Sequence, residues 1–341
     1  MTGASTGMGA ATARELARRG YHVLAGVRTD RDAAALRAPD TSRNADRPAR
    51  PRIGAGPHVA AQHNPGRPGP VGTVQHDTGT HSAGRPGAAG THQHDTDTGT
   101  RSSGLEPVIL DITNPDHIAA LAARVDGDPL RRPLRALVNN AGIPGAGPVE
   151  LVPLDEWRRI FEVNLFGHVA VTQALLPALV RSKGRVVNIT SMSGKLSMAG
   201  YGPYASSKFA MEAMSDALRN ELAPDGVQVV VVEPGGVKTE MAGHGTAGLR
   251  GLADRMTPAQ NVRYGPLMQA IPSHVAAFTE AGVTSDVAAR TIARAVTGRR
   301  PRTRYTIGSA AAFLIGVSRF LPDRLLDRIT TRDLRKHYPA A

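Results

Sequence analysis

Short runs of β-branched residues alternate with segments of helical periodicity along most of the chain. Runs expected to form strands buried on both faces lie at residues 22–27, 107–110, 134–138, 185–189 and 227–232. Helical patterns between them cover residues 12–19, 154–179 and 203–222. Strands that alternate with helices form crossover units, which predicts a doubly wound parallel α/β sheet that binds ligands at the carboxyl ends of its strands.

Residues 39–104 interrupt this alternation. The stretch holds 8 Pro and 11 Gly in 66 residues, half of the chain's 12 histidines, and almost no large apolar side chains. Such a composition cannot bury enough surface to offset its conformational entropy, so we expect a disordered insertion. Its histidines, including His76, His81, His92 and His94, could bind a metal, but the lack of a closed ligand set favours a solvated linker and no metal site.

The overall composition narrows the class of protein. The chain has no cysteine, so nothing requires an oxidising compartment. Its formal net charge of +12 comes from scattered arginines with few aromatic residues, which argues against nucleic-acid binding. No secretory signal is readable, and the apolar run at residues 307–317 is too short to span a bilayer. We therefore expect a soluble, cytoplasmic protein.

Three features could carry chemistry. A glycine-rich turn, TGASTGMG at residues 2–9, leads into a helix whose N-terminus could approach a pyrophosphate. Tyr204 and Lys208 lie one helical turn apart, so the ammonium is expected to lower the tyrosine pKa and make Tyr204 a proton donor. Ser191 ends a strand thirteen residues upstream, where its hydroxyl could bind a carbonyl oxygen. Taken singly, such a turn can merely close a loop, and a tyrosine and lysine can share this spacing by chance.

Six motifs in combination resemble the short-chain dehydrogenase/reductase family. They are TGASTGMG (2–9), NNAG (139–142), VNLFG (163–167), TSMSG (190–194), YASSK (204–208) and EPGGVKT (233–239). Two C-terminal sequences, RPRTRYTIG (300–308) and FLPDRLLDRI (320–329), resemble hydroxysteroid and retinol dehydrogenase-like members. The six motifs carry the resemblance to the family. All occur in the family's order and near its spacing, over the whole chain except the insertion. The resemblance implies a single Rossmann-fold domain.

The resemblance also implies a catalytic tetrad of Asn164, Ser191, Tyr204 and Lys208. Tyr204 would exchange the proton and Ser191 would hold the substrate oxygen. Lys208 would bind the nicotinamide ribose, and Asn164 would help position a proton-relay water. Ser193 is a rival to Ser191, but the thirteen-residue spacing to the tyrosine favours Ser191.

A nicotinamide cofactor follows from the same resemblance. The residues implied to contact it are Gly3, Ser5, Gly7, Met8, Gly9, Arg28, Asp111, Ile112, Asn139, Ala141, Gly142, Tyr204, Lys208, Pro234, Gly235, Val237 and Thr239. NAD sites usually place an acidic residue at the end of the strand that follows the glycine turn, whereas a 2′-phosphate needs a cation. Val27 fills the acidic position and Arg28 follows, which favours NADP (NADPH) over NAD.

Two features depart from the family. Members normally carry an apolar strand just before the glycine turn, at the centre of the sheet, and this first strand is missing from the sequence. Its loss would leave two neighbouring strands with unpaired backbone groups, so we expect either a start that lies upstream or a protein that folds poorly as written. The second departure is the insertion, which lies in a surface connection and adds little closure cost.

The predicted organisation is one catalytic domain, residues 1–38 and 105–308, around the insertion at 39–104, with a C-terminal helical extension at 309–341. The expected reaction is reversible hydride transfer between NADP(H) and a secondary alcohol or ketone, with a lipophilic, steroid- or retinoid-like substrate. The alternative is a non-catalytic NADP-binding regulatory protein, against which the complete tetrad argues.

Two interactions beyond the substrate are expected. The family usually forms homo-oligomers through long helices such as residues 154–179. The tail could also make weak peripheral contact with an anionic membrane, because Arg299, Arg300, Arg302 and Arg304 lie near Phe313, Leu314 and Phe320 in the sequence.

Overall fold

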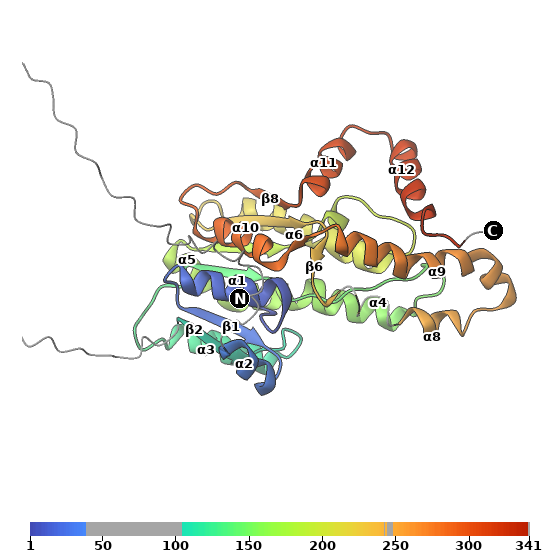
Figure 1. Ribbon diagram of the computed structural model, residues 1–341. Coiled ribbons are helices and arrows are strands. Elements are labelled where there is room, and N and C mark those ends of the chain that lie inside the picture. Colours follow the sequence, from blue (N-terminus) through green and yellow to red (C-terminus); the bar gives the residue numbers. More distant parts are fainter. Residues whose placement is uncertain (39–103, 242, 244–247, 340–341) are drawn as a thin grey trace, which may run out of the picture. The chain divides into compact units, whose positions relative to one another are not determined.

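The computed structural model describes residues 1–38, 104–241, 243 and 248–339 of the chain. The described stretches on either side of residues 39–103 belong to one unit (Figure 1). The predictions for the insertion, including disorder and the role of its histidines, fall outside the described residues, apart from Gly104.

The strands of this unit pair in parallel, as the alternation of strands and helices predicts. A continuous four-stranded sheet has the order β3 (Ala136–Asn139), β4 (Arg185–Ile189), β5 (Gln228–Pro234) and β8 (Arg304–Ile307). Separate pairs are formed by β1 (Val23–Val27) with β2 (Leu105–Ile109), and by β6 (Val237–Lys238) with β7 (Val283–Thr284).

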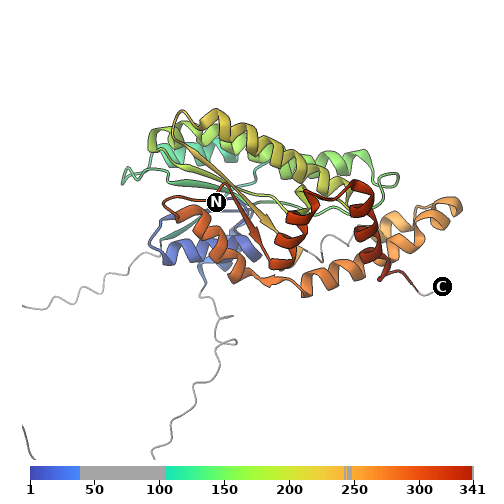
Figure 2. The same cartoon turned by 90° about the horizontal axis from the view of Figure 1, so that it is seen from above.

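Helices cover both faces of the sheet, which confirms the predicted doubly wound α/β fold (Figure 2). One face carries α3 (Pro115–Asp126), α4 (Leu154–Phe161), α5 (Gly167–Ser182) and α6 (Gly202–Leu222), and the other carries α1 (Gly7–Arg18), α2 (Asp30–Arg37) and α10 (Ser285–Thr297). Leu175 and Leu179 of α5 pack in one core cluster with Val186 of β4. Leu16 of α1 packs in another with Val27 of β1.

The sheet is interrupted between β1 and β3, where the sequence lacks an apolar strand before the glycine turn. The first residues of the chain bridge this seam: Gly26 N donates to Met1 O (2.8 Å), and Thr2 N donates to Val138 O (2.9 Å). Beyond them the facing edges line a cavity of about 320 Å³, whose walls include Leu24 and Leu137. Among the described residues, no strand lies between β1 and β3.

The predicted helix at 154–179 is a continuous helical stretch, Leu154–Ser182, in which the π-helical turn η2 (Glu162–Phe166) joins α4 to α5. By length and hydropathy it could cross a membrane, a property that the sequence reasoning missed. A core helix of a soluble protein passes the same test, and Val171, Leu175 and Leu179 are buried in the core cluster that includes β4.

The C-terminal part adds α8 (Leu249–Ala253), α9 (Pro258–Glu280), α11 (Ser309–Ser318) and α12 (Asp323–Arg335). α12 returns to α9, where Leu334 packs with Leu267 and Ile271. The same two helices also meet where His274 Nε2 of α9 lies 3.4 Å from Asp333 Oδ2 of α12.

Candidate active site

The structure brings Ser191, Tyr204 and Lys208 together at the carboxyl edge of the four-stranded sheet. β4 ends at Ile189, and Ser191 caps the short 3-10 turn η3 (Met192–Gly194). Tyr204 lies in the first turn of α6, beside a proline that favours helix initiation, and Lys208 lies one turn later. All three side chains line one cavity of about 200 Å³, here called the tyrosine cavity.

Tyr204 is half-buried, and its surroundings shift its acidity. Burial raises the pKa of the Tyr204 phenol above 10, and a hydrogen bond with Ser191 opposes the rise. The Lys208 ammonium lies 5.8 Å from the centroid of the tyrosine ring. Desolvation of the phenolate dominates this shift, and the lowering of the tyrosine pKa by Lys208 stays a prediction. A phenol protonated at neutral pH can act as a proton donor.

Lys208 is only 4% exposed. Its Nζ donates to the carbonyl oxygen of Ile189, at the end of β4 (3.1 Å). Burial lowers the pKa of Lys208 to about 8, and the negative charge of Glu212 opposes this change. The ammonium is thus mostly charged at pH 7 but close to its titration range.

Asn164 lies in the π-helical turn, a feature often found at functional sites. Its Oδ1 accepts from Ile143 N (2.8 Å), and its Nδ2 donates to Ile143 O (3.0 Å) and to Ser207 Oγ (3.1 Å). The side chain is fully buried and holds the segment after β3 next to α6. Its part in a proton relay stays a prediction.

A second cavity, of about 270 Å³, lies at the N-terminus of α1 and is here called the glycine-turn cavity. Gly3 has φ +64°, a conformation that favours glycine, and a Cβ at Gly9 would lie only 1.9 Å from Gly3 O. Thr6, at the N-cap of α1, makes no side-chain capping hydrogen bond. Tight backbone, small residues and a helix N-terminus without a side-chain cap fit a pyrophosphate group.

Most residues predicted to contact the nucleotide line these two cavities. The glycine-turn cavity is lined by Gly3, Ser5, Gly7, Met8, Gly9, Arg28, Asp111, Ile112, Ala141, Gly142 and Thr239. The tyrosine cavity is lined by Met8, Gly142, Tyr204, Lys208, Pro234, Gly235, Val237 and Thr239. Met8 and Gly142 line both cavities, so the two cavities lie next to each other.

Asn139 has a different position. Its side chain is fully buried, and Nδ2 donates to Asn188 Oδ1 (2.9 Å) and Thr172 Oγ1 (3.0 Å). The amide therefore stabilises the core between β3, β4 and α5, outside both cavities. Its neighbour Asn140 lines both cavities.

Arg28 follows β1 and is an exposed residue in the wall of the glycine-turn cavity. Asp111 lies in the same wall, where Oδ1 accepts from Thr113 N (2.9 Å) and Oγ1 (2.7 Å). Burial would raise the pKa of Asp111, but these bonds and the charge of Arg28 hold it below its ordinary value. This cavity therefore contains a guanidinium near a carboxylate that is ionised at neutral pH.

Two residues that the sequence reasoning did not assign shape the wall between the cavities. Asn140 Nδ2 donates to Thr2 O (3.1 Å) and Gly3 O (2.9 Å), which fixes the glycine turn. His168 of α5 is fully buried, and its Nε2 donates to Ala141 O (2.7 Å). The NNAG motif contained Asn140, whereas no local pattern distinguishes His168 from a surface histidine.

Comparison with known proteins agrees with this geometry. A family model described as short chain dehydrogenase matches residues 87–249. Retinol dehydrogenase 5 of Mus musculus is 37% identical over 241 residues, which cover 67% of this chain and 74% of that protein. An NADPH-dependent 3-dehydrocapnine reductase of Ornithobacterium rhinotracheale is 36% identical over 211 residues, 60% of this chain and 72% of that protein.

A solved short-chain dehydrogenase from Streptomyces avermitilis superposes with a TM-score of 0.60 at 25% identity, and the match covers 97% of this chain and 93% of that structure. Together, the sheet, the two cavities and these relatives show that the chain belongs to the short-chain dehydrogenase/reductase family, enzymes that act on CH–OH groups with a nicotinamide cofactor.

Proposed function

We propose that this enzyme transfers a hydride reversibly between NADP(H) and an apolar secondary alcohol or ketone in the tyrosine cavity. The observation that carries the proposal is the shared cavity of Ser191, Tyr204 and Lys208, with a half-buried phenol next to a hydroxyl and an ammonium. The nicotinamide supplies or accepts the hydride at the substrate carbon. The residues of this chain handle the proton.

In the direction of reduction, Ser191 and Tyr204 hold the carbonyl oxygen. As negative charge develops on that oxygen, Tyr204 gives it a proton and the hydrogen bond from Ser191 strengthens. The Lys208 ammonium, 5.8 Å from the ring centroid, stabilises the phenolate that remains. We assign to Asn164 the positioning of a proton-relay water.

For the cofactor we propose NADPH. Gly3, Gly7 and Gly9 would hold the pyrophosphate, and Pro234 and Gly235 would hold the nicotinamide end. Arg28 would pair with the 2′-phosphate, because it is exposed in the wall of the glycine-turn cavity. The name of one relative, an NADPH-dependent reductase, supports this preference.

The substrate class follows from the walls of the tyrosine cavity. Beyond the proposed catalytic groups they are formed mostly by apolar side chains, which include Met192, Leu196, Met198, Val275 and Phe278, with polar ones such as Tyr201 and His274 among them. Such a surface favours a lipophilic alcohol or ketone. The similarity to retinol dehydrogenases supports a substrate of this kind.

We further propose a cytoplasmic homo-oligomer with weak peripheral contact to membranes. Leu154 and Phe166 on the long helix are 62% and 54% exposed and are candidates for subunit contact. Phe313 and Phe320 in the tail are 72% and 88% exposed. Arg304 does not belong to a lipid-facing surface as predicted, because its guanidinium is turned inward onto three carboxylates.

The test is Tyr204→Phe, which keeps the ring and removes the proton donor. With NADPH and a ketone found by screening, we expect kcat to fall about 10²–10⁴-fold. NADPH affinity, measured by nucleotide fluorescence, should change little. Stopped-flow absorbance of NADPH gives the rate of the chemical step.

Tyr305→Phe is the matched control. It removes a phenol hydroxyl on β8 that accepts from Arg302 N and lies outside both cavities, so kcat should stay near the parent value. A Tyr204→Phe enzyme that reduces the ketone at the parent rate between pH 6 and 9 would disprove the mechanism. A chain that binds NADPH but turns over no carbonyl compound would favour the regulatory alternative.

A further inference from the structure

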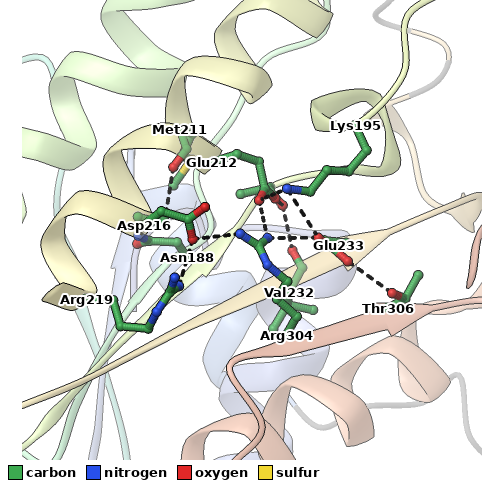
Figure 3. A network of polar contacts seen from close by, with 12 residues as sticks. Asn188, Lys195, Met211, Glu212, Asp216, Arg219, Val232, Glu233, Arg304 and Thr306 are labelled. Atoms are coloured by element: carbon green, nitrogen blue, oxygen red, sulfur yellow. Dashed lines mark hydrogen bonds and ion pairs between the residues drawn. The ribbon is translucent and has the colours of Figure 1, made fainter. Parts of the chain in front are cut away.

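Figure 3 shows a cluster of charged side chains that is joined to the tyrosine cavity through Thr190, a residue of the cavity wall that contacts Glu212. Arg304 of β8 contacts Glu212, Asp216 Oδ1 (2.7 Å) and Glu233 Oε1 (3.0 Å). Lys195, which follows η3, contacts Glu212 Oε2 (2.6 Å). Four separate parts of the chain, η3, α6, β5 and β8, are therefore joined at one place.

Glu212 is the member of this cluster that lies on the same helix as Tyr204 and Lys208. It lies one turn after Lys208 on α6 and is only 4% exposed. Its Oε1 accepts from Thr190 Oγ1 (2.6 Å), the residue just before Ser191. One carboxylate thus touches the strand end that carries the serine and lies one helical turn from the lysine.

The cost of burying Glu212 indicates a role beyond stability. A buried carboxylate needs strong compensation, and an apolar residue of similar size often stabilises a core as well or better. Here the compensation comes from Lys195 and Arg304 on one side and from Thr190 on the other. The arrangement holds a carboxylate in one place on the helix that carries Tyr204 and Lys208.

We propose that Glu212 is a positioning residue for the reaction: its carboxylate holds Thr190, and thereby Ser191, against α6, one helical turn from Lys208. This inference rests on the proposed function, in which Tyr204 and Lys208 handle the proton. Glu212 itself does not line the tyrosine cavity and acts only through its neighbours.

The charges around Lys208 set the direction of the expected effect. Lys208 interacts electrostatically with three titratable groups: His168 of α5, Tyr204 and Glu212. Glu212 in turn lies among Lys195, Glu233, Asp216 and Arg304. Burial lowers the pKa of Lys208 to about 8, and Glu212 opposes this. Without the carboxylate charge the lysine pKa falls further, so activity that needs the ammonium is lost at a lower pH.

The experiment measures kcat against pH for Glu212→Gln, which keeps the size and the acceptor for Thr190 but removes the charge. We expect the alkaline limb of the kcat–pH profile, where activity falls as Lys208 loses its proton, to move to lower pH by roughly one unit. Glu212→Asp keeps the charge and should retain most of the parent profile. The same shift should appear in the pH dependence of NADPH affinity, which needs no substrate.

Asp216→Asn is the matched control. Asp216 binds the same Arg304 but lies two turns from Lys208 and is half-exposed, so its loss should leave the alkaline limb in place. Lys195→Gln gives a test of opposite sign, because removing a cation beside Glu212 should move the limb to higher pH. This variant keeps the proposal testable even if Glu212→Gln does not fold.

An unchanged limb in Glu212→Gln, or equal shifts in Glu212→Gln and Asp216→Asn, would overturn the proposal. So would a downward shift in Lys195→Gln. These outcomes are distinct from failure of the proposed function, which is decided by the rate of Tyr204→Phe. A Glu212→Gln protein that only melts at a lower temperature, with its pH profile intact, would show a purely structural role.

Discussion

His168 is expected to make the protein less stable in mild acid. Its ring is fully buried, Nε2 donates to Ala141 O, and Nδ1 has no hydrogen-bond partner among the described residues. Burial, followed by the charge of Lys208, lowers the pKa of His168 from 6.5 to about 3. The unfolded chain therefore takes up a proton near pH 6.5 that the folded chain does not, and stability is lost as the pH falls from 6.5 toward 3.

The size of this effect follows from the two pKa values. A difference of one pH unit is worth about 1.4 kcal/mol. Between pH 7 and pH 5, His168 alone should therefore remove about 2 kcal/mol from the free energy of unfolding. His168→Gln keeps an amide donor for Ala141 O and cannot titrate, so this variant should lack that loss. Urea unfolding at pH 7, 6 and 5 measures the difference.

His22→Gln is the control, since it removes an exposed imidazole that contacts Glu106 and leaves His168 in place. It should keep the loss that His168 causes. If the parent and His168→Gln lose the same stability between pH 7 and pH 5, the buried ring is not the cause and the reasoning is refuted.

Two further predictions concern the glycine-turn cavity, with affinities read by nucleotide fluorescence. Arg28→Asp should weaken NADPH binding by about 1.5–3 kcal/mol, roughly 10–150-fold, because a charged hydrogen bond to phosphate is lost, and it should leave NADH binding unchanged. Arg31→Asp makes the same charge change in α2, outside the cavity wall, and should leave the affinity for both nucleotides unchanged. Equal losses in both variants would contradict the Arg28 assignment. Gly9→Ala should lower both NADPH affinity and melting temperature, since its Cβ would lie 1.9 Å from Gly3 O. Gly251→Ala is the control: a Cβ at this position would meet no atom within 4 Å, so both quantities should stay unchanged.

The elements around the site were predictable where a local pattern is strong. The runs at 185–189 and 227–232 are continuous β-branched stretches, and they form β4 and most of β5. β8 was not predicted, because RYTI at Arg304–Ile307 is short and follows a run of arginines and Pro301. Its strand conformation depends on pairing with β5, in which Arg304 aligns with Val231.

Side-chain environment was less predictable than position. The motifs placed Ser191, Tyr204 and Lys208 on the right strand end and helix, because helical spacing is a local property. They could not give the sign of the tyrosine pKa shift, which depends on burial. Nor could they show that Asn139 points into the core while Asn140 faces the cavities, or that Glu212 meets Arg304 from 92 residues away.

The seam between β1 and β3 links the fold to nucleotide binding. Thr2 Oγ1 accepts from the backbone N–H groups of Asn140 and Ala141 (2.9 Å each), and the Asn140 amide donates back to the carbonyls of Thr2 and Gly3. These bonds join the glycine turn to the end of β3, next to a stretch where the strands are unpaired and line a cavity. Ser191, Tyr204 and Lys208, by contrast, are supported by the continuous sheet β3–β4–β5–β8 and by α6. Loosening of the seam should therefore weaken cofactor binding before it disturbs the geometry of the tyrosine cavity.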